Sequence, residues 1–516
     1  MTLLLHDLVE RQAKSRPQAV AVAFKDRRLT YGELQEQVEK WAAVLHGRGV
    51  RAGDAFGLVM RNSPEFVVTF FALVRLGARA VPINFLLKAD EIAFIFEDAG
   101  VVGVITQPPF VKNVLAARRQ LPALRDVILT GDRKEDLLSF NQLLASAPPV
   151  GDVPRAADAE APAMIIYTSG TTGRPKGAML THRNFIGNVE QCVAMVKLSP
   201  KDVFLCLLPM FHSFAWTVCV LVPAYLGCKI VIVESIQPFG DVIRQIMRQR
   251  ASIFVAVPPI YAALLRVPFW WPLRFLNPLR LCISGAAALP TAVQKKFEGK
   301  FGIPLLEGYG LTEASPVVTL NPEKRRVPGS VGQALPGITL KIIDEQGQPL
   351  PIGEAGEICL RGANVMKGYY RQVEATRQSF LDDQHEWLRT GDIGYLDPEG
   401  YLHISDRKKD LIIVKGLNVY PKEVEDVLLE HAAVAEAAVI GLADETGDEI
   451  IRAYVTLKEN ASAERAELLK WCREKLASYK CPKDVEIRRE LPKNTLGKIL
   501  KRTLRQEAAG SPPPSE

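Results

Sequence analysis

The first three hundred residues alternate between short apolar runs and segments in which apolar residues recur at helical spacing. Helical spacing covers residues 6–14, 32–48 and 65–76, and Thr30 is placed to cap the second of these helices. Buried strands are predicted at 20–24, 56–60, 79–83, 103–105, 126–129, 229–233, 252–257 and 279–284. Strands that alternate with helices at this spacing predict parallel βαβ units and an α/β fold.

The last hundred residues follow a dense cluster of charges, Asp406-Arg407-Lys408-Lys409-Asp410. Strand-like residues 401–404 and 411–414 flank this cluster, so on local grounds it is a tight turn. Helices are predicted near 421–430 and 464–477, and strands near 434–440 and 451–458. The polar, proline-rich residues 508–516 are expected to be disordered.

The most apolar segment, residues 215–233, is interrupted by Pro223, Gly227 and Lys229. We therefore predict a core helix, a turn and a buried strand rather than a transmembrane span. Leu3-Leu4-Leu5 is too short for the apolar region of a signal peptide.

Composition adds few constraints. The net charge of +6 is spread along the chain among acidic residues, which argues against a nucleic-acid partner. The eight cysteines form no Cys-x-x-Cys pair, and five lie in apolar runs, which predicts buried reduced thiols. We therefore expect a cytoplasmic protein. The sequence is compatible with a homodimer but does not decide the oligomeric state.

Residues Tyr167 to Gly177 read Tyr-Thr-Ser-Gly-Thr-Thr-Gly-Arg-Pro-Lys-Gly and follow the apolar run 163–166, which predicts a strand. Glycines let the backbone approach a ligand, successive amide groups can form an anion nest, and Lys176 adds positive charge. Polyphosphate suits such a loop. It differs from a P-loop, because Lys176 is followed by glycine rather than serine or threonine. Taken alone, it is also compatible with a flexible hairpin.

Four further segments follow in order: Tyr309-Gly310-Leu311-Thr312-Glu313, Thr390-Gly391-Asp392, the cluster 406–410, and Pro492-Lys493-Asn494-Thr495-Leu496-Gly497-Lys498. With the loop, they resemble the adenylate-forming superfamily of acyl-CoA synthetases, luciferases and peptide-synthetase adenylation domains, most of all long-chain fatty acid–CoA ligases. The resemblance covers residues 4–505. It implies two layered sheets, a β-rich subdomain near 330–405 and a small mobile domain. The implied division is 1–406, a hinge at 407–410, and 411–507.

Activation of a carboxylate by ATP brings an anion to an anionic phosphate, so the site needs cations and backbone donors rather than a protein nucleophile. The resemblance makes Glu313 the Mg²⁺ ligand, with Thr168 also near the metal. It assigns Thr312 to the α-phosphate and the Tyr309 ring to the adenine. On local grounds Glu313 also suits the N-terminus of a helix.

The resemblance assigns further nucleotide contacts to small, hydroxylated or charged residues. They are Ser169, Gly170, Thr171, Thr172, Gly173, Lys176, Gly285, Gly308, Asp392 with the ribose, Arg407 with ribose and phosphate, and Asn418. Taken alone, Asp392 is a turn residue.

Lys498 resembles the mobile-domain lysine that bridges the substrate carboxylate and the α-phosphate, a role that a flexible point charge suits. Its local alternative is a solvated helix face. Lys409 occupies the hinge position. Lys415 and Gly416 resemble the pair beside the pantetheine arm of CoA, and on local grounds they form a turn.

The segment from Pro209 to Trp216 lies where the family places the gate of the acyl pocket, so His212 is expected beside the substrate carboxylate. Amino-acid-activating relatives carry an aspartate at this place to pair with the ammonium group. No acidic residue occurs between Asp202 and Glu234, which disfavours amino acids. The expected surroundings suit an alkyl chain: Val220, Leu221, Val257, Pro258, Ile260, Tyr261, Val317 and Val318.

Residues 266–276 place Trp270 and Trp271 between arginines. This composition suits either peripheral membrane contact or a loop folded onto the protein's own surface.

We therefore expect an enzyme that converts a medium- to long-chain fatty acid, MgATP and CoA to acyl-CoA through an acyl-adenylate. The alternatives are an aryl or 4-coumarate-type acid–CoA ligase and a fatty acyl-AMP ligase that loads a carrier protein. A non-catalytic nucleotide sensor would lack Glu313 or Lys498, and both are present.

Overall fold

The computed structural model describes residues 2–131, 137–151, 153–168, 175–267, 277–407, 410–414, 417–443, 449–494, 497–508 and 510. The chain forms two compact units. The first unit comprises Met1–Thr339 and Arg361–Leu388, and the second comprises Leu340–Leu360 and Arg389–Glu516. The hinge at 407–410 and the tail at 508–516 stay predictions, because residues 408–409, 509 and 511–516 lie outside the described part.

A nine-stranded sheet forms one half of the first unit. Its order is β16 (Gln333–Ala334), β15 (Val317–Leu320), β14 (Leu305–Gly310), β13 (Leu281–Ser284), β12 (Ile253–Ala256), β10 (Val203–Cys206), β11 (Lys229–Ile232), β1 (Val20–Phe24) and β2 (Arg27–Thr30). The strands from β14 to β1 in this order pair in parallel, as the βαβ pattern predicts, and antiparallel strands close both edges.

An eight-stranded sheet forms the other half of the first unit. Its order is β19 (Gly368–Tyr369), β9 (Lys176–Thr181), β8 (Pro162–Thr168), β4 (Arg79–Pro82), β3 (Ala55–Val59), β5 (Val101–Thr106), β6 (Asp126–Leu129) and β7 (Leu138–Ser139). β9 pairs antiparallel with both β8 and β19. The edge strand β19 therefore brings residues 368–369 beside the hairpin that carries the glycine-rich loop.

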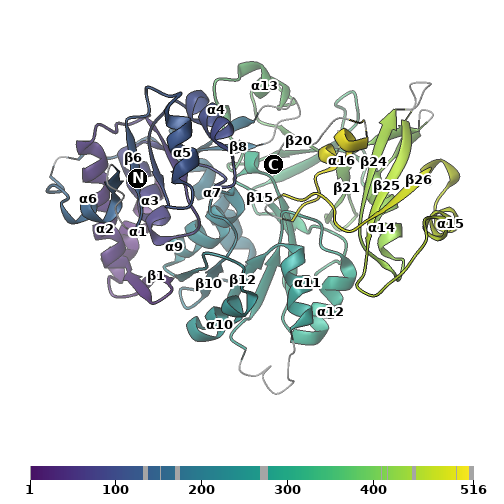
Figure 1. Ribbon diagram of the computed structural model, residues 1–516. Coiled ribbons are helices and arrows are strands. Elements are labelled where there is room, and N and C mark those ends of the chain that lie inside the picture. Colours follow the sequence, from purple (N-terminus) through teal and green to yellow (C-terminus); the bar gives the residue numbers. More distant parts are fainter. Residues whose placement is uncertain are drawn as a thin grey trace. The chain divides into compact units, whose positions relative to one another are not determined.

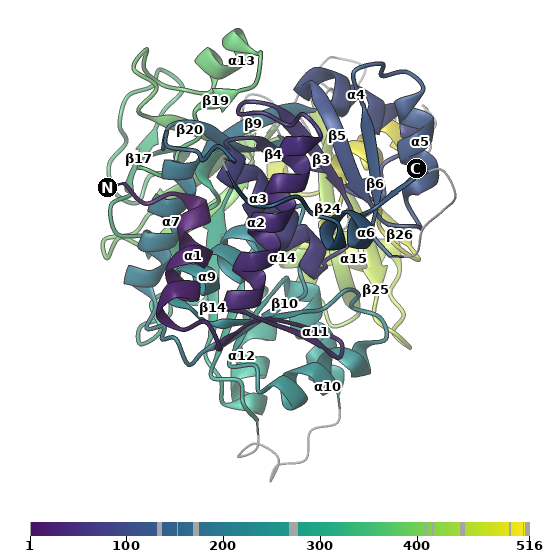
Figure 2. The same ribbon diagram turned by 90° about the vertical axis from the view of Figure 1, so that its left-hand side faces the viewer.

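Helices cover these sheets. They are α1 (Leu5–Ser15), α2 (Tyr31–Gly47), α3 (Pro64–Leu76), α4 (Ala89–Ala99), α5 (Val111–Arg118), α6 (Phe140–Ala145), α7 (His182–Met195), α10 (Phe239–Gln249), α11 (Pro258–Arg266), α12 (Thr291–Phe301) and α13 (Val373–Gln378). Figure 1 shows α11 and α12 beside the teal strands, and Figure 2 shows the purple helices α1 and α2 side by side next to α3. Thr30 caps α2 as predicted, because its Oγ1 accepts from Glu33 N at 3.2 Å.

Helix α3 is buried along its whole length, and its sequence is mostly apolar, with Glu65 and Arg75 as its charged residues. Ser63 caps its start, and Gly77 ends it in the left-handed conformation. Its Phe66 and Phe70 rings lie 5.2 and 4.4 Å from the ring of Trp216. The helix thus packs on the apolar segment 215–233, which is α8 (Ser213–Trp216), a π-helical turn (Thr217–Leu221), α9 (Val222–Leu226) and β11.

The described residues of the second unit form three smaller sheets. Its strands are β17 (Thr339–Ile343), β18 (Gly356–Arg361), β20 (Leu388–Leu396) and β21 (Leu402–Arg407), then β22 (Ile412–Val414) with β23 (Leu417–Val419), then β24 (Val434–Ala443), β25 (Glu449–Leu457) and β26 (Asp484–Arg488). Its helices are α14 (Pro421–Leu429), α15 (Arg465–Lys475) and α16 (Lys501–Ala508). Asp406 and Arg407 continue β21, so the charged cluster is not wholly a turn.

The α/β fold class is confirmed, with two large sheets and a β-rich segment at 339–407. All eight cysteines lie in described residues and are free thiols, with seven buried and Cys481 half-buried. Among the described residues, no helix has the length and apolarity needed to cross a membrane.

Candidate active site

The hairpin of β8 and β9 presents the ends of the glycine-rich loop. Thr168, the last residue of β8, pairs with Lys176, the first residue of β9. Ser169, Gly170, Thr171, Thr172 and Gly173 lie outside the described residues, so their assignment to phosphate stays a prediction. What the structure fixes is the position of the two flanking side chains.

Glu313 lies in a 3₁₀ turn, Thr312–Ala314, that follows β14. Its Oε1 accepts hydrogen bonds from Thr168 Oγ1 at 3.3 Å and from the Tyr369 hydroxyl at 2.9 Å. The carboxylate therefore faces the β8–β9 hairpin, and its partners lie on distant strands rather than on its own turn. Local stabilisation of a helix terminus does not explain this arrangement.

Tyr369 is a site residue that the sequence analysis missed. Besides its bond to Glu313, its ring lies 5.3 Å from Lys176 Nζ. Burial, together with the adjacent carboxylate, raises the pKa of Tyr369, so the phenol stays protonated and donates its hydrogen bond. The residue is half-buried on β19, and no local sequence signal marks it, because its role depends on strand pairing.

The turn that carries Glu313 is held by the segment leading into β19. Met366 N donates to Glu313 O at 2.8 Å, and the Asn364 side chain donates to Ala314 O at 2.8 Å. The Asn184 side chain, from α7, donates in turn to Ala363 O and Val365 O at 2.9 and 2.7 Å. These bonds fix the backbone on both sides of the Tyr369–Glu313 contact.

Thr312 lies next to the segment predicted to gate the acyl pocket. Ser213 Oγ donates to Thr312 Oγ1 at 3.5 Å, and Thr217 Oγ1 donates to Ser315 O at 2.8 Å. The π-helical turn that begins at Thr217 thus contacts the loop carrying Thr312. Such turns occur often at functional sites.

His212 is half-buried, and its ring lies 4.3 Å from that of Phe211. Burial lowers the pKa of His212 to about 4, so the imidazole is neutral near pH 7. A neutral ring can accept or donate a hydrogen bond without placing a positive charge in an apolar surrounding.

Gly285 follows β13 and lies against Phe214 of the segment predicted to gate the acyl pocket. A Cβ at this position would lie 2.9 Å from Cζ of Phe214, so glycine is needed for the close approach of this ring. Gly308 and Tyr309 lie on β14, where they pair with Leu320 and Thr319 of β15. The structure thus places these predicted residues in the same unit as Glu313, and their contact with a nucleotide stays a prediction.

The residues expected around an alkyl chain are all apolar and buried in the first unit. Tyr261 is fixed among them, because its hydroxyl lies 3.0 and 2.8 Å from Phe254 O and Ile283 O, which share its one donated proton. Its polar group is thereby satisfied by the backbone of β12 and of β13.

Asp392 lies in the second unit on β20, where it is buried and pairs in register with Arg407 of β21. Thr390 Oγ1 accepts from Asp392 N at 3.0 Å, which shapes the backbone at this point. Asn418 pairs with Ile413 in the β22–β23 hairpin. Lys409, Lys415 and Gly416 lie outside the described residues.

Lys498 lies in a tight turn that precedes α16 in the second unit. Its amide donates to Asn494 Oδ1 at 2.9 Å, and Asn494 N donates to Lys498 O at 2.9 Å. Gly497 adopts a φ of 76°, the left-handed conformation that glycine favours in turns. Lys498 is therefore a turn residue rather than part of the helix face that its basic neighbours suggested.

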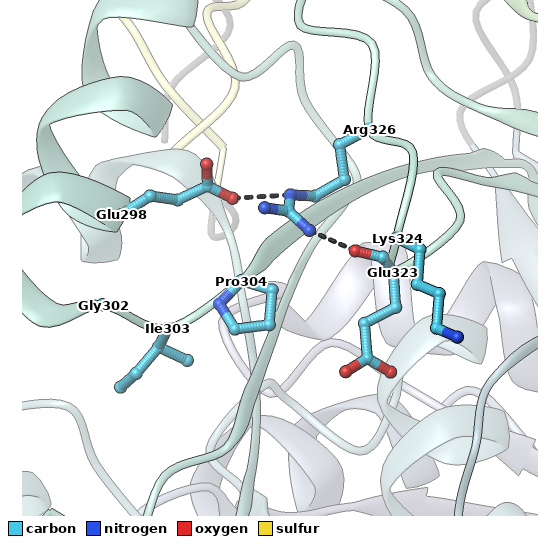
Figure 3. A pocket seen from close by; sticks show the side chains of 7 residues that line it. All are labelled: Glu298, Gly302, Ile303, Pro304, Glu323, Lys324 and Arg326. Atoms are coloured by element: carbon cyan, nitrogen blue, oxygen red, sulfur yellow. Dashed lines mark hydrogen bonds and ion pairs between the residues drawn. The ribbon is translucent and has the colours of Figure 1, made fainter.

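A pocket of about 380 Å³ lies elsewhere in the first unit, between the end of α12 and the loop after β15. Figure 3 shows Arg326 between the Glu298 carboxylate, 2.8 Å away, and the carbonyl oxygen of Glu323. Ile303 and Pro304 line its apolar side. Within the described part of the chain, none of the predicted site residues lines this pocket.

The Glu313 cluster fits the expected metal. One carboxylate with an adjacent threonine hydroxyl offers only hard oxygen donors, and Mg²⁺ typically takes one or two carboxylates besides water and phosphate oxygens.

Comparisons with known proteins bear on this site. A family model described as AMP-binding enzyme matches residues 9–370, and one described as AMP-binding enzyme C-terminal domain matches residues 423–498. A long-chain-fatty-acid–CoA ligase of Bacillus subtilis (strain 168) is 34% identical, over 98% of this chain and 94% of its own. A feruloyl-CoA synthase of an Amycolatopsis species is 35% identical, over 96% and 97%. The crystal structure of ATP-bound MatB from Rhodopseudomonas palustris superposes with a TM-score of 0.89 at 33% identity, covering 98% of this chain and 99% of that one.

Proposed function

The chain belongs to the AMP-binding enzyme family and is an ATP-dependent, AMP-forming acid–CoA ligase; on this premise we propose that its substrate is a medium- to long-chain fatty acid. The adenylate-forming resemblance drawn from the sequence is thereby confirmed. The observation that carries the proposal is the convergence of Thr168 and Tyr369 on Glu313, with Lys176 against the Tyr369 ring. This cluster suits MgATP, in a chain whose similar proteins include long-chain fatty acid–CoA ligases.

The reaction has two steps. A carboxylate oxygen of the acid attacks the α-phosphorus of ATP, the bond to the β-phosphate oxygen breaks, and pyrophosphate leaves. The CoA sulfur then attacks the acyl carbon, the bond to the AMP oxygen breaks, AMP leaves, and the thiol proton passes to solvent. Both steps develop negative charge on phosphate oxygens, so positioned cations and donors supply the catalysis.

We propose the following roles. Lys176 and the adjoining loop bind phosphate, Thr312 donates to the α-phosphate, and Lys498 supplies the cation at the reacting carboxylate and phosphate. Glu313 and Thr168 would hold Mg²⁺, which neutralises phosphate charge when bound. Asp392 and Arg407 bind the ribose, with Gly285, Gly308, Tyr309 and Asn418 at the nucleotide, Lys409 at the hinge, and Lys415 with Gly416 at CoA.

The apolar, uncharged character of the acyl region supports a fatty acid. His212 is neutral, and no acidic residue between Asp202 and Glu234 is available to pair with an amino acid's ammonium group. An unpaired buried charge is costly, so a neutral acyl group is favoured.

An aryl acid is the second candidate, because a feruloyl-CoA synthase is as similar to this chain as the fatty acid ligases are. A panel of short-, medium- and long-chain acids and aryl acids, with MgATP and with or without CoA, tests both. AMP and thioester are followed separately. Thioester from long-chain acids supports the proposal, and activity on aryl acids alone overturns it. Adenylate without thioester would indicate a carrier-protein acceptor.

We also propose a cytoplasmic protein, a homodimer, that contacts membranes peripherally through residues 266–276. The support for membrane contact is the sequence, which places Trp270 and Trp271 between Arg266 and Arg274. The support for the cytoplasm is the set of free, mostly buried thiols. Co-sedimentation with anionic vesicles should fall when both tryptophans are replaced by alanine. Unchanged co-sedimentation would contradict membrane contact, and a monomeric mass in light scattering would contradict the homodimer.

A further inference from the structure

We propose that Tyr369 is a positioning residue that orients both Glu313 and Lys176, and so couples the metal-binding carboxylate to the phosphate-binding lysine. The inference rests on the proposed function, because it takes Glu313 as the metal ligand. Tyr369 itself contacts neither the metal nor the reacting atoms in this assignment.

The hydroxyl of Tyr369 acts on Glu313. It donates to Oε1 at 2.9 Å, and Thr168 Oγ1 donates to the same oxygen at 3.3 Å. Two donors on one carboxylate oxygen restrict the rotation of the carboxylate, because a rotated carboxylate would lose both hydrogen bonds. A hydrogen bond to a charged group is stronger than one between neutral groups, so its loss should be measurable.

The ring of Tyr369 acts on Lys176. The ammonium lies 5.3 Å from the ring centroid, within the range of a cation–π contact. Because Tyr369 pairs with Ala178, two residues beyond Lys176, the ring reaches the lysine from the neighbouring strand. One side chain therefore holds two groups that lie 137 positions apart in the sequence, Lys176 and Glu313.

The backbone around Tyr369 is fixed independently of its side chain. Lys367 N donates to Met179 O at 3.0 Å, and Tyr370 N donates to Gly177 O at 2.8 Å. Tyr369 N donates to Thr376 Oγ1 at 2.8 Å. A change confined to the side chain should therefore alter the two contacts without displacing β19.

Two variants separate the two contacts. Tyr369→Phe removes the hydroxyl and keeps the ring, whereas Tyr369→Leu removes both. Tyr370→Phe is the matched control, because the neighbouring ring lies 4.9 Å from the guanidinium of Arg79 and 5.1 Å from that of Arg371. Thermal unfolding of each variant reports any general loss of structure.

The measurement is calorimetric binding of α,β-methylene-ATP, which is not cleaved at the α,β bond, across a Mg²⁺ titration without acid or CoA. We expect Tyr369→Phe to raise the half-maximal Mg²⁺ concentration about tenfold, the effect of losing one charge-assisted hydrogen bond. At saturating Mg²⁺ its nucleotide affinity should return to the wild-type value. Tyr369→Leu should bind the nucleotide more weakly even at saturating Mg²⁺, because the contact of Lys176 with the aromatic ring is also lost.

A double variant distinguishes loss of the Tyr369–Glu313 contact from a general effect of the substitution on the fold. In the Glu313→Gln background, Tyr369→Phe should add no further shift in the Mg²⁺ dependence. An unchanged Mg²⁺ dependence in Tyr369→Phe, an equal shift in Tyr370→Phe, or a persistent shift in the Glu313→Gln background would each overturn the inference. Because no acid or CoA is present, failure here is distinct from failure of the proposed substrate.

Discussion

Lys501 and Glu425 form a largely buried ion pair in the second unit, with Nζ 2.7 Å from Oε1 and side chains only 17% and 16% exposed. Glu425 Oε1 also accepts from Val439 N at 2.8 Å. Burial lowers the pKa of Lys501, but the nearby carboxylates of Glu425 and Asp406 outweigh burial and raise it overall. The pair ties the start of α16 to α14, three residues after Lys498.

We expect Lys501→Met to lower the free energy of unfolding of the second unit by about 3 kcal/mol, because it leaves a buried carboxylate without its partner. The double variant Lys501→Met with Glu425→Leu should recover most of this loss. Urea unfolding measures both, and Lys470→Met, at an exposed position on α15, is the control. Equal destabilisation of the single and double variants would show that the carboxylate is not the cause.

Lys498→Ala should abolish acyl-adenylate formation while ATP still binds, because the lysine is assigned to the reacting groups rather than to nucleotide affinity. Pyrophosphate release and calorimetric ATP binding measure the two properties separately. Lys493→Ala is the control. It changes a neighbouring lysine that pairs with Glu436, and it should retain turnover. Near-normal turnover of Lys498→Ala would remove this residue from the catalytic assignment.

The unfolding free energy of the first unit should fall on acidification because two buried histidines act as hydrogen-bond acceptors. His182 Nδ1 accepts from Leu5 N at 3.2 Å, and His6 Nε2 accepts from Arg155 Nε at 3.0 Å. Burial lowers the pKa of each to about 4. Below about pH 6.5 the unfolded chain takes up protons that the folded chain excludes, so stability drops by about 1.4 kcal/mol per pH unit for each histidine.

The variants His182→Asn and His6→Gln keep an acceptor atom but do not titrate in this range. Between pH 6.5 and 4, the unfolding free energy of each variant should fall less steeply than that of the wild type, because one of the two titrating histidines is absent. His385→Asn, at an exposed position, should leave the slope unchanged. A slope that stays as steep in both buried variants would assign the acid sensitivity to other groups.

Gly285→Ala should lower kcat/KM for the acid about tenfold, because the added methyl group displaces the Phe214 ring at the gate segment. Adding Phe214→Leu should restore much of the loss by making room. Gly299→Ala, where an added Cβ meets nothing within 4 Å, is the control and should not reduce activity. If Phe214→Leu failed to restore activity, the close approach of the Phe214 ring would not be the reason for the loss in Gly285→Ala.

Local sequence patterns were sufficient to predict many of the helices and strands. The apolar run 163–166 lies in β8, the capped segment after Thr30 forms α2, and the segment near 421–430 contains α14. Periodicity and capping act over a few residues, so they can be read without knowing what packs against them. The π-helical turn at Thr217–Leu221 was not predicted, because its surroundings rather than a local signal determine it.

The sequence by itself predicted which chemical groups the site would contain, since its motifs name Glu313, Thr168, Lys176 and Lys498. Only the tertiary structure decided how Glu313, Thr168 and Lys176 are held. The Glu313 carboxylate meets hydroxyl groups 145 residues before it and 56 residues after it. Such contacts depend on the pairing of β19 with β9 and on the placement of the turn after β14. Strand register across separate parts of the chain is set by the packing of the whole sheet, and for that reason Tyr369 could not be recognised before the fold was known.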